Sequence, residues 1–480
     1  MGIECHREVI SSSHNIRLAA AVALSAAVLV AGAPAPALAP AIAGAHLTSG
    51  HRSAPYLSDR VIVGYRARPS AAAAAALDRA TGVRSTAFAP AATSRVVRLA
   101  PGDSVPRAIA RLRSQRGVAY AVPDYIAHAA GEFIPDDVGN THQRAGWEKL
   151  QWNFLAGAGV NAPGAWANLI AAGKPGGRGV TVAVLDTGVA YRNWRQYRAS
   201  PDFTGVRFTA PYDFVAHNRY PLDHEGHGTF VAGTIAEATN NGLALTGLAY
   251  GATIMPVRVL DSTGYGDASA IARGIRYAVQ HHAQVINLSL EFPPSIDAGD
   301  IPDILSAVRY AHDHGAVVVA ASGNEASSHL AYPARSSSVI SVGASTGDRC
   351  LASYSNSGSG LDLVAPGGGN DSIALASDSN CHPFVYGRPI DQMTLLNATS
   401  NPGRFGIAGD YYGTSMSSAH VAAIAALVIA SGVIGSHPTA DQVLARLKVT
   451  AQHLGRGWPN ADYGFGLVDA AAATAPTPGR

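Results

Sequence analysis

The chain has 480 residues, of which 47% are hydrophobic, 7% aromatic and 14% charged, and its formal net charge is +2. At about 100–200 residues per domain, this length predicts two or three folded units. The many apolar residues and few charges exclude a generally disordered chain, which has the opposite composition. The small net charge excludes a strong attraction of the whole chain to nucleic acid or to an acidic membrane.

The first 43 residues have the composition of a secretory signal peptide. Arg7 and Arg17 precede a short apolar run at 18–33, and small residues that suit cleavage end at Ala39 and Ala43. A membrane anchor is the alternative, but the run is short and prolines follow it directly. We therefore expect a secreted, extracellular protein with no membrane span in the mature chain.

The cysteines are consistent with export. Cys5 lies in the predicted signal peptide, which leaves Cys350 and Cys381 as an even pair in the exported chain. Because exported proteins enter an oxidising compartment, we expect a Cys350–Cys381 disulfide, with two free thiols as the alternative. No C-x-x-C pair or Cys/His cluster indicates structural zinc.

Charge divides the rest of the chain into two parts of opposite sign. Residues 46–130 hold 12 Arg, no Lys and 4 Asp, a net charge of +8, whereas 131–480 hold 21 Lys and Arg against 27 Asp and Glu, a net charge of −6. The arginines are spread without interleaved aromatic residues, which argues against nucleic-acid binding. The opposite charges favour docking between the two parts of the chain.

Within the basic part, hydrophobic periodicity predicts a small α+β domain that we place at 56–130. Its expected elements are, in chain order, a strand at 60–65, a helix at 71–80, a strand at 94–99, a helix at 105–115 and a strand at 117–122.

After residue 180 the pattern changes to alternating strands and helices. Apolar strands are expected at 180–185, 253–260, 285–290, 316–321, 339–344 and 361–365, and helices at 229–237, 268–282, 301–314 and 415–430. Near-continuous apolar strands separated by helices predict a parallel sheet covered on both faces. The last ten residues are expected to form a solvated tail.

Four polar residues stand at the ends of these elements. Asp186 and Asn324 each follow a strand, whereas His227 and Ser415 each begin a helix. A serine hydroxyl becomes a nucleophile when an imidazole removes its proton, and a carboxylate on the other ring nitrogen orients that imidazole. The side-chain amide of Asn324 and the backbone N–H of Ser415 would stabilise the oxyanion of an acyl transfer.

Other hydrolase classes fit only parts of these motifs. Asp186-Thr-Gly is an aspartic-protease motif, but the chain has no second Asp-Thr-Gly or Asp-Ser-Gly. His224-Glu-Gly-His227 is one residue shorter than the zincin motif H-E-x-x-H. An α/β-hydrolase assignment of Ser415 would need Asp441 and His453 as partners, which leaves no room for a strand between them.

Three segments together resemble the signatures of the subtilisin-like serine proteases (peptidase family S8). They are Asp186-Thr-Gly, His227-Gly-Thr-x-Val-Ala-Gly and Gly413-Thr-Ser-Met-Ser-x-x-His-Val, in that family's order. The resemblance covers roughly 150–475. It implies a subtilisin-like peptidase domain at 131–475, folded as a three-layer α/β/α sandwich with a mostly parallel sheet.

The resemblance also implies roles for single residues. Asp186 would orient the imidazole, His227 would be the general base, Ser415 the nucleophile and Asn324 the oxyanion donor in peptide-bond hydrolysis through an acyl-enzyme. A secreted pseudoprotease that binds peptides without cutting them is the alternative, but no member of the Asp, His and Ser set is missing.

The basic domain resembles the family's inhibitory propeptide, which is a ferredoxin-like unit that assists folding and is then removed. The segment 122–130 matches the end of such propeptides, so we expect processing near Ala130–Gly131. The partners implied are polypeptide substrates and the chain's own propeptide as an intramolecular inhibitor, with no nucleic acid.

Family resemblance places the substrate-binding segments at Ser289, Leu290 and Glu291 and at Ser322 and Gly323. Glu291 stands where the family usually has Gly, so its carboxylate either faces the primary specificity pocket or points to solvent. A second departure is Phe230, which replaces the second His of His-Gly-Thr-His and removes a polar group beside the site.

Two further features remain open at this stage. Residues 367–412 look longer than in compact family members and contain Cys381, so this insertion is either a disulfide-tethered loop or a wall of the substrate cleft. Thr239-Asn-Asn-Gly242 occupies the place of a family calcium loop, with an ordinary turn as the alternative. No other cofactor is expected.

Overall fold

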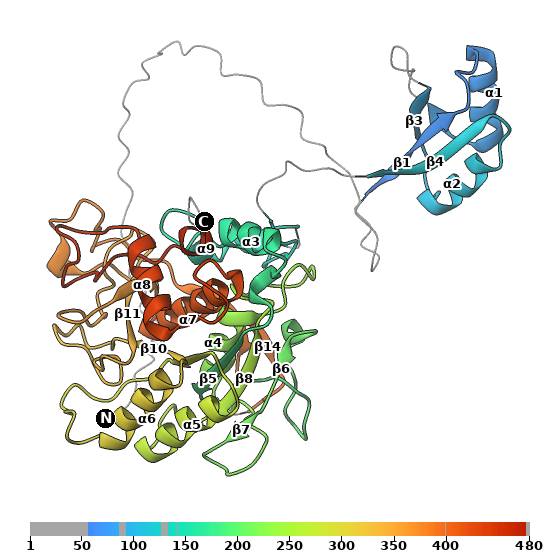
Figure 1. Ribbon diagram of the computed structural model, residues 1–480. Coiled ribbons are helices and arrows are strands. Elements are labelled where there is room, and N and C mark those ends of the chain that lie inside the picture. Colours follow the sequence, from blue (N-terminus) through green and yellow to red (C-terminus); the bar gives the residue numbers. More distant parts are fainter. Residues whose placement is uncertain (1–55, 86–92, 126–132, 142, 399, 477–480) are drawn as a thin grey trace, which may run out of the picture. The chain divides into compact units, whose positions relative to one another are not determined.

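The computed structural model describes residues 56–476, apart from 86–92, 126–132, 142 and 399 (Figure 1). Contacts divide the chain between Ala130 and Gly131 into two compact units, which are described one at a time. The predicted signal peptide and the predicted processing site lie outside the described residues.

The first unit is the small α+β domain expected from the sequence. Its elements are β1 (Tyr56–Tyr65), α1 (Ala71–Thr81), β2 (Arg84–Ser85), β3 (Ser94–Arg98), α2 (Val105–Arg113) and β4 (Val118–Tyr125). The sheet has the order β2-β3-β1-β4 and is antiparallel. All five predicted elements are present, and the two-residue strand β2 is the addition.

The core of this unit comes from alternate strand residues. Val61, Val63 and Val97 are fully buried and pack with Leu112 of α2. Part of the arginine excess is structural, because Arg95 is buried and its guanidinium lies 2.5 Å from the carboxylate of Asp78.

The second unit is built around an eight-stranded sheet in the order β12-β11-β10-β9-β5-β8-β6, with β7 also paired to β8. The strands are β5 (Thr181–Asp186), β6 (Arg207–Phe208), β7 (Tyr212–Asp213), β8 (Thr253–Arg258), β9 (Val285–Leu288), β10 (Val317–Ala321), β11 (Ile340–Ser345) and β12 (Leu363–Pro366). Every pairing in this sheet is parallel, as the sequence predicts.

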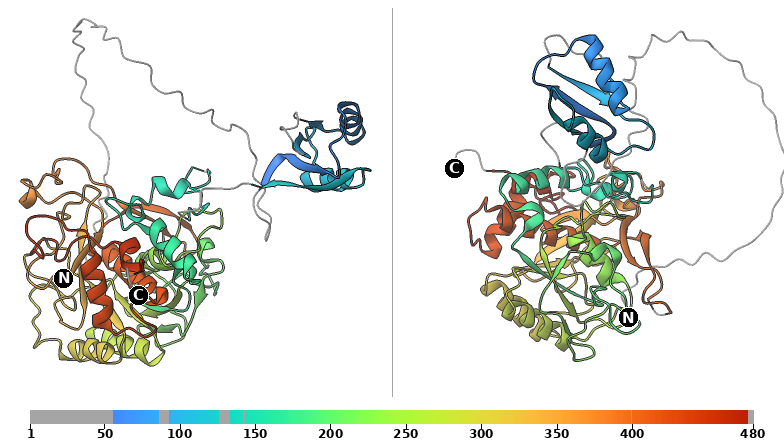
Figure 2. Two further views of the ribbon diagram at one scale, coloured as in Figure 1. Left: turned by 45° about the horizontal axis from the view of Figure 1, so that its top comes forward. Right: turned by 90° about the vertical axis from the view of Figure 1, so that its right-hand side faces the viewer.

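Helices cover both faces of the sheet (Figures 1 and 2). They are α3 (Ala162–Ala171), α4 (His227–Ala236), α5 (Ala268–Gln280), α6 (Pro302–Asp313), α7 (Thr414–Ser431), α8 (Ala440–Thr450) and α9 (Ala470–Thr474). Short 3₁₀ turns lie at Gly146–Lys149, Trp152–Phe154, Pro175–Gly177, Pro201–Phe203 and Ile373–Leu375.

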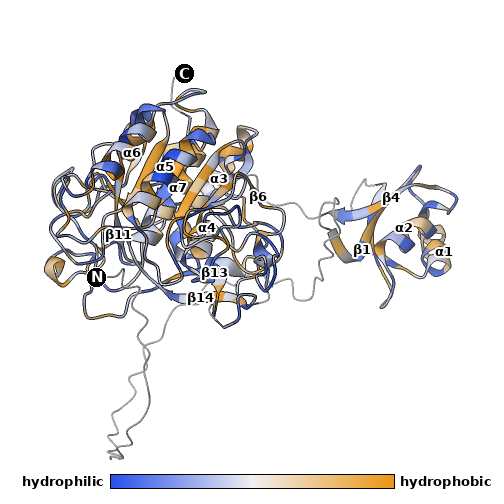
Figure 3. Cartoon of the chain, turned by 90° about the horizontal axis from the view of Figure 1, so that it is seen from below, coloured by the Kyte–Doolittle hydropathy of each residue, from blue (hydrophilic) through white to orange (hydrophobic). Residues whose placement is uncertain are grey.

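Two hydrophobic cores form because successive strand residues point to opposite faces of the sheet. In β5, Val182 and Val184 pack on the side of α4 and α7, whereas Ala183 and Leu185 pack on the side of α5 and α6. Figure 3 shows hydrophobic colouring on the central strands and on the helices that cover them. The result is the predicted three-layer sandwich.

Helix α7 is long and apolar enough to cross a membrane by length and composition, and 83% of that stretch is buried inside the protein. Among the described residues no other helix meets that test. Its position between the sheet and the outer helices α3, α8 and α9 explains the composition, because a helix covered on every side is apolar all round.

Several segments differ from the expectations. Strands β6 and β7 and helices α3, α8 and α9 were not predicted. The last ten residues do not all form a solvated tail, because Ala473 and Thr474 in α9 are buried and Asp469 caps that helix. The insertion contains an antiparallel hairpin, β13 (Ile390–Leu395) and β14 (Phe405–Tyr411), which the sequence did not predict.

Candidate active site

Asp186 and His227 meet at the carboxyl end of the central strand. Asp186 is the last residue of β5, and its Oδ1 lies 2.7 Å from Nδ1 of His227, the first residue of α4. Burial, the largest single effect, lowers the pKa of His227, but the charge and hydrogen bond of Asp186 together with the nearby Glu225 and Asp223 carboxylates raise it to about 9. A carboxylate held on Nδ1 leaves Nε2 as the nitrogen that exchanges protons.

Close packing between the two segments depends on Gly228. A Cβ atom at this position would lie 2.1 Å from the carbonyl oxygen of Gly188 and 3.1 Å from Cβ of Asp186. A side chain there would therefore push α4 away from β5 and lengthen the bond between Asp186 and His227.

Asp223 fixes the turn that leads into α4. Its Oδ1 accepts the backbone N–H groups of Glu225 and Gly226 at 2.9 Å, and its Oδ2 accepts the backbone N–H and hydroxyl of Thr229 at 2.9 and 2.6 Å. The sequence analysis missed this buried residue, although an Asp just before a predicted helix is a recognisable capping signal.

Ser415 lies in the first turn of α7, next to the end of β9. Its Oγ donates a hydrogen bond to the carbonyl oxygen of Ser289 at 3.3 Å, and Oγ of Ser289 donates one to the carbonyl oxygen of Ser415 at 2.8 Å. His227 and Ser289 line one small cavity, and Nε2 of His227 has no hydrogen-bond partner among the described residues. In the part of the chain that the structure describes, no hydrogen bond joins Ser415 to His227, and Ser289, which lines the cavity beside the imidazole, is the residue that links them.

Asn324 follows β10 and is fixed by bonds on both sides of its amide. Oδ1 accepts the backbone N–H and the hydroxyl of Thr414 at 2.9 and 3.1 Å. Its Nδ2 donates to Oε1 of Glu291 at 3.2 Å, and its backbone N–H donates to Oε2 at 3.1 Å. Because Nδ2 carries two hydrogens, one N–H remains for another acceptor beside Ser415.

The Glu291 carboxylate therefore points toward Asn324 rather than to open solvent. Burial and the nearby Glu325 carboxylate raise the pKa of Glu291 to about 7, against the two hydrogen bonds from Asn324, which lower it. Glu325 in turn accepts a hydrogen bond from Nδ2 of Asn356 at 2.6 Å. Neither Glu325 nor Asn356 was predicted, although Glu325 is adjacent in sequence to Asn324.

The other predicted substrate-binding side chains point inward. Leu290 is buried in the core on the side of α5 and α6, and Oγ of Ser322 donates to the carbonyl oxygen of Asn356 at 2.9 Å. Gly323 has φ +115°, and a Cβ atom there would lie 2.0 Å from Nδ2 of Asn356. The prediction that these segments bind substrate would therefore have to rest on their backbone rather than on these side chains.

Phe230 occupies the fully buried position on α4 where the family's second His stands. Its ring stacks on Tyr411 of β14, with ring centroids 4.3 Å apart and an angle of 19° between the planes. The residue thus joins the hairpin β13–β14 to α4 by apolar contact.

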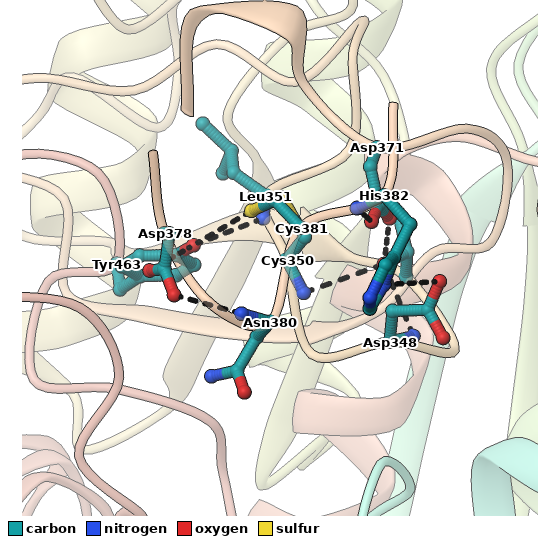
Figure 4. The surroundings of a disulfide bond; sticks show 10 residues. Asp348, Cys350, Leu351, Asp371, Asp378, Asn380, Cys381, His382 and Tyr463 are labelled. Atoms are coloured by element: carbon teal, nitrogen blue, oxygen red, sulfur yellow. Dashed lines mark hydrogen bonds and ion pairs between the residues drawn. A yellow bond between two sulfur atoms is a disulfide. The ribbon is translucent and has the colours of Figure 1, made fainter. Parts of the chain in front are cut away.

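Cys350 and Cys381 form the expected disulfide, with Cα atoms 5.1 Å apart, so the alternative of two free thiols is wrong (Figure 4). Close to it, His382 donates its backbone N–H to the Asp371 carboxylate at 2.5 Å, and its Nδ1 lies 3.4 Å from the Asp348 carboxylate. The insertion is therefore tethered to the loop that follows β11.

A group of buried carboxylates lies beside the predicted calcium loop. Asp137 accepts the backbone N–H groups of Asn240 and Asn241, and Asp202 accepts Nδ2 of Asn241. Glu237 is fully buried, and neither of its carboxylate oxygens has a hydrogen-bond partner within the described part of the chain. Burial is the main cause that raises all three carboxyl pKa values, to about 7 for Asp137 and about 6 for Asp202.

The α/β sandwich, with Asp, His, Asn and Ser residues at the carboxyl edge of its parallel sheet, is the arrangement expected of a hydrolase. Comparison with known proteins gives the family. Residues 177–466 match the model of the Subtilase family, and residues 44–124 match the Fervidolysin N-terminal prodomain.

Sequence similarity to known relatives extends over most of the chain. It is 34% identical to Subtilisin E of Bacillus subtilis (strain 168) over 373 residues, which cover 76% of this chain and 78% of that protein. It is 31% identical to a Thermophilic serine proteinase of Bacillus sp. (strain AK1) over 388 residues, 81% of this chain and 82% of that protein. A solved protease of Pseudoalteromonas arctica PAMC 21717 has a TM-score of 0.56 and 30% identity, covering 71% of this chain and 99% of that one.

The protein belongs to the subtilase family of serine endopeptidases and carries an N-terminal prodomain.

Proposed function

We propose that the protein is a secreted serine endopeptidase that is made as a self-processing zymogen and uses Asp186, His227 and Ser415 as its triad. The observation that carries the proposal is the 2.7 Å bond between Asp186 Oδ1 and His227 Nδ1, beside a cavity that the imidazole shares with Ser289. Ser415 is bound to Ser289 through two hydrogen bonds, so its hydroxyl belongs to the same site.

Acyl transfer would begin when the Ser415 hydroxyl turns from the Ser289 carbonyl toward Nε2 of His227. The imidazole removes the proton as Oγ attacks the substrate carbonyl carbon, and Asp186 stabilises the imidazolium that forms. The imidazolium then protonates the leaving amine, which separates from the acyl-enzyme. Water, deprotonated by the same imidazole, hydrolyses the acyl-enzyme and restores Ser415.

Asn324 would stabilise the tetrahedral intermediate. Glu291 holds one hydrogen of Nδ2, and Thr414 holds Oδ1, so the second hydrogen of Nδ2 has a fixed direction. The backbone N–H of Ser415, in the first turn of α7, is the other donor. A donor fixed before reaction costs no reorganisation when the oxyanion develops.

The first unit would act as the propeptide at 56–130, with processing near Ala130–Gly131. Its independent sheet and core support a separately folding unit, and its net charge opposes that of the peptidase part. Export would follow from the signal peptide at 1–43, as for an extracellular protease.

Calcium would bind at the buried carboxylates beside the loop 239–242. One structural observation supports a cation here: Glu237 is buried near Asp137 and Asp202, and neither of its oxygens is hydrogen-bonded to any residue that the structure describes. Hard divalent cations prefer carboxylate and carbonyl oxygens. Asp137, Asp202 and Glu237 would supply the charge, and the ion would support the fold without taking part in peptide hydrolysis.

The test is the mass and N-terminal sequence of the purified product, with wild type beside Ser415→Ala. We expect wild type to begin near Gly131, and Ser415→Ala to keep the first unit after signal removal. That difference would make Ser415 the nucleophile of the chain's own processing. If both proteins keep the first unit and wild type cleaves no peptide, the pseudoprotease alternative replaces the proposal.

A further inference from the structure

Residues of the insertion build a cavity of about 520 Å³ beside the strand that leads to Ser415. Tyr386 and Asn370 come from the insertion loop, Asp410 and Tyr412 from the end of β14 and the residues just after it, and Tyr354 from the loop after β11. This volume lies within the range of ordinary ligand pockets, about 300–1,000 Å³. The cavity therefore has room for a substrate side chain.

The cavity is physically joined to the segment that carries the proposed nucleophile. Tyr412 precedes Gly413, whose backbone N–H donates to the carbonyl oxygen of Gly367 at 3.0 Å. The hydroxyl of Tyr354 lies 2.9 Å from the carbonyl oxygens of both Gly367 and Gly368. The start of the insertion is thus bound to the turn before Ser415.

The middle of the insertion is also anchored to the rest of the protein. The Cys350–Cys381 disulfide anchors it, and the backbone N–H of Gly387, next to Tyr386, donates to Oδ1 of Asn370 at 2.9 Å. The insertion is therefore a disulfide-tethered loop, the first of the two alternatives that the sequence left open, and it also lines this cavity. The second alternative, that it forms a wall of the substrate cleft, is part of the proposal below.

The lining has the chemistry of a site for a long cationic side chain. The rings of Tyr354 and Tyr412 lie 5.5 Å apart, and Tyr386 is 96% exposed. Asp410 is exposed, and its carboxylate forms no ion pair with any described residue. Aromatic faces attract a cation and cover its aliphatic stem, and a carboxylate at the end of the pocket pairs with the charge.

We propose that this cavity binds a lysine or arginine side chain on the leaving-group side of the scissile bond, with Asp410 and Tyr386 as specificity-determining residues. The proposal rests on the proposed function. We place the cavity on the leaving-group side because it shares no residue with the segments 289–291 and 322–323, which the resemblance assigns to substrate binding.

The test uses peptides that are identical before the scissile bond and carry Arg, norleucine or Glu at the first or second position after it. We expect kcat/KM for Arg to exceed that for norleucine about fivefold to tenfold at one of these positions. Asp410→Asn should reduce the ratio to near 1, and Tyr386→Ala should lower kcat/KM for both Arg and norleucine. Asp303→Asn, which removes an exposed charge on α6, is the matched control and should change nothing.

A peptide anilide, which has no residue after the scissile bond, separates this inference from the proposed function. Wild type, Asp410→Asn and Tyr386→Ala should hydrolyse it equally, which also shows that the variants fold. Two outcomes would overturn the inference alone, with anilide hydrolysis unchanged. One is an equal kcat/KM for the Arg and norleucine peptides in wild type, and the other is a preference for Arg that Asp410→Asn does not remove. Loss of anilide hydrolysis in wild type overturns the proposed function and this inference together.

Discussion

Glu291 binds Asn324 through both of its carboxylate oxygens: Oε1 accepts Nδ2 at 3.2 Å and Oε2 accepts the backbone N–H at 3.1 Å. Asn324 is the proposed oxyanion donor, so a carboxylate lies directly behind the group that would stabilise negative charge. The interaction fixes the direction of the amide, but its charge opposes the charge that the amide stabilises.

The first prediction concerns pH. The pKa of Glu291 is raised to about 7, so the carboxylate is largely protonated below that pH and ionised above it. Ionisation should weaken oxyanion stabilisation, and Glu291→Gln should remove this loss. We expect the ratio of kcat for Glu291→Gln to kcat for wild type to rise about fivefold between pH 6 and pH 8. The ratio cancels the titration of His227, which both enzymes share; a flat ratio would show that Glu291 does not influence the oxyanion.

The second prediction concerns the residue before the scissile bond. The family resemblance places Glu291 beside the primary specificity pocket, where a carboxylate would favour basic or small side chains over acidic ones. Glu291→Gly should therefore shift preference away from basic residues. The measurement is kcat/KM for substrates with Lys, Ala or Glu at that position, in both enzymes. Unchanged ratios among the three substrates would contradict the prediction.

The third prediction concerns acid stability. His420 is fully buried, with Nδ1 2.7 Å from the carbonyl oxygen of Met416 and Nε2 2.8 Å from Nδ2 of Asn153. Burial lowers its pKa to about 4, so between pH 6.5 and 4 the unfolded chain binds a proton that the folded chain does not. The contribution of His420 to the free energy of unfolding should therefore fall by about 3 kcal/mol over this range, whereas the buried carboxyls with raised pKa values, such as Asp137 and Asp202, contribute in the opposite direction.

Urea unfolding of the Ser415→Ala protein measures this effect without autolysis. Adding His420→Gln should remove the His420 contribution, so its effect on the free energy of unfolding should differ by about 3 kcal/mol between pH 6.5 and pH 4. Adding His437→Gln at an exposed position should have the same effect at both pH values. If both double variants keep the full acid dependence, other groups cause it.

The fourth prediction concerns the disulfide, which closes a loop with a sequence separation of 31. Replacing both cysteines by serine should lower the free energy of unfolding by about 3 kcal/mol. The bond also anchors the part of the insertion that carries Tyr386, which lines the proposed side-chain cavity. Its loss should therefore reduce hydrolysis of peptides with residues after the scissile bond more than it reduces hydrolysis of a peptide anilide. Equal losses for the two substrates would show that the insertion does not touch the substrate.

The fifth prediction concerns calcium. Chelation should lower the Tm of the Ser415→Ala protein, and calcium should restore it, because the cation would neutralise the buried Asp137, Asp202 and Glu237. Adding Glu237→Gln should raise Tm in the presence of chelator, where the buried charge is unopposed, and should reduce the shift that calcium produces. A Tm that calcium leaves unchanged in the parent protein would refute a calcium site.

The sequence predicted six of the eight strands of the sheet, because strands such as β5, β9 and β10 are apolar at most positions, and this pattern depends on burial between two layers. The two-residue strands β6 and β7 are too short to show such a pattern and were not predicted. The sequence also led to the residues that meet at the sheet edge, since parallel strands end on the same side. Asp186 and His227 lie 41 positions apart in the chain, yet their bond follows from that topology.

Other features depend on contacts that no local pattern contains. The hairpin β13–β14 is stabilised by α4, through the stacking of Phe230 on Tyr411, and Ile390 is buried in the same cluster. The direction of the Glu291 side chain is set by Asn324, 33 positions later in the chain, so the sequence left two orientations open. In the same way, the inward direction of Ser322 depends on Asn356.

The proposed nucleophile lies on α7, which begins at Thr414, whereas the first unit ends near residue 125. A ribosome therefore releases the whole first unit, β5 and α4 long before it reaches Ser415. Until residue 415 has been translated, the chain lacks the proposed nucleophile. Under the proposed function, the order of synthesis would therefore supply the inhibitor before the protease can act.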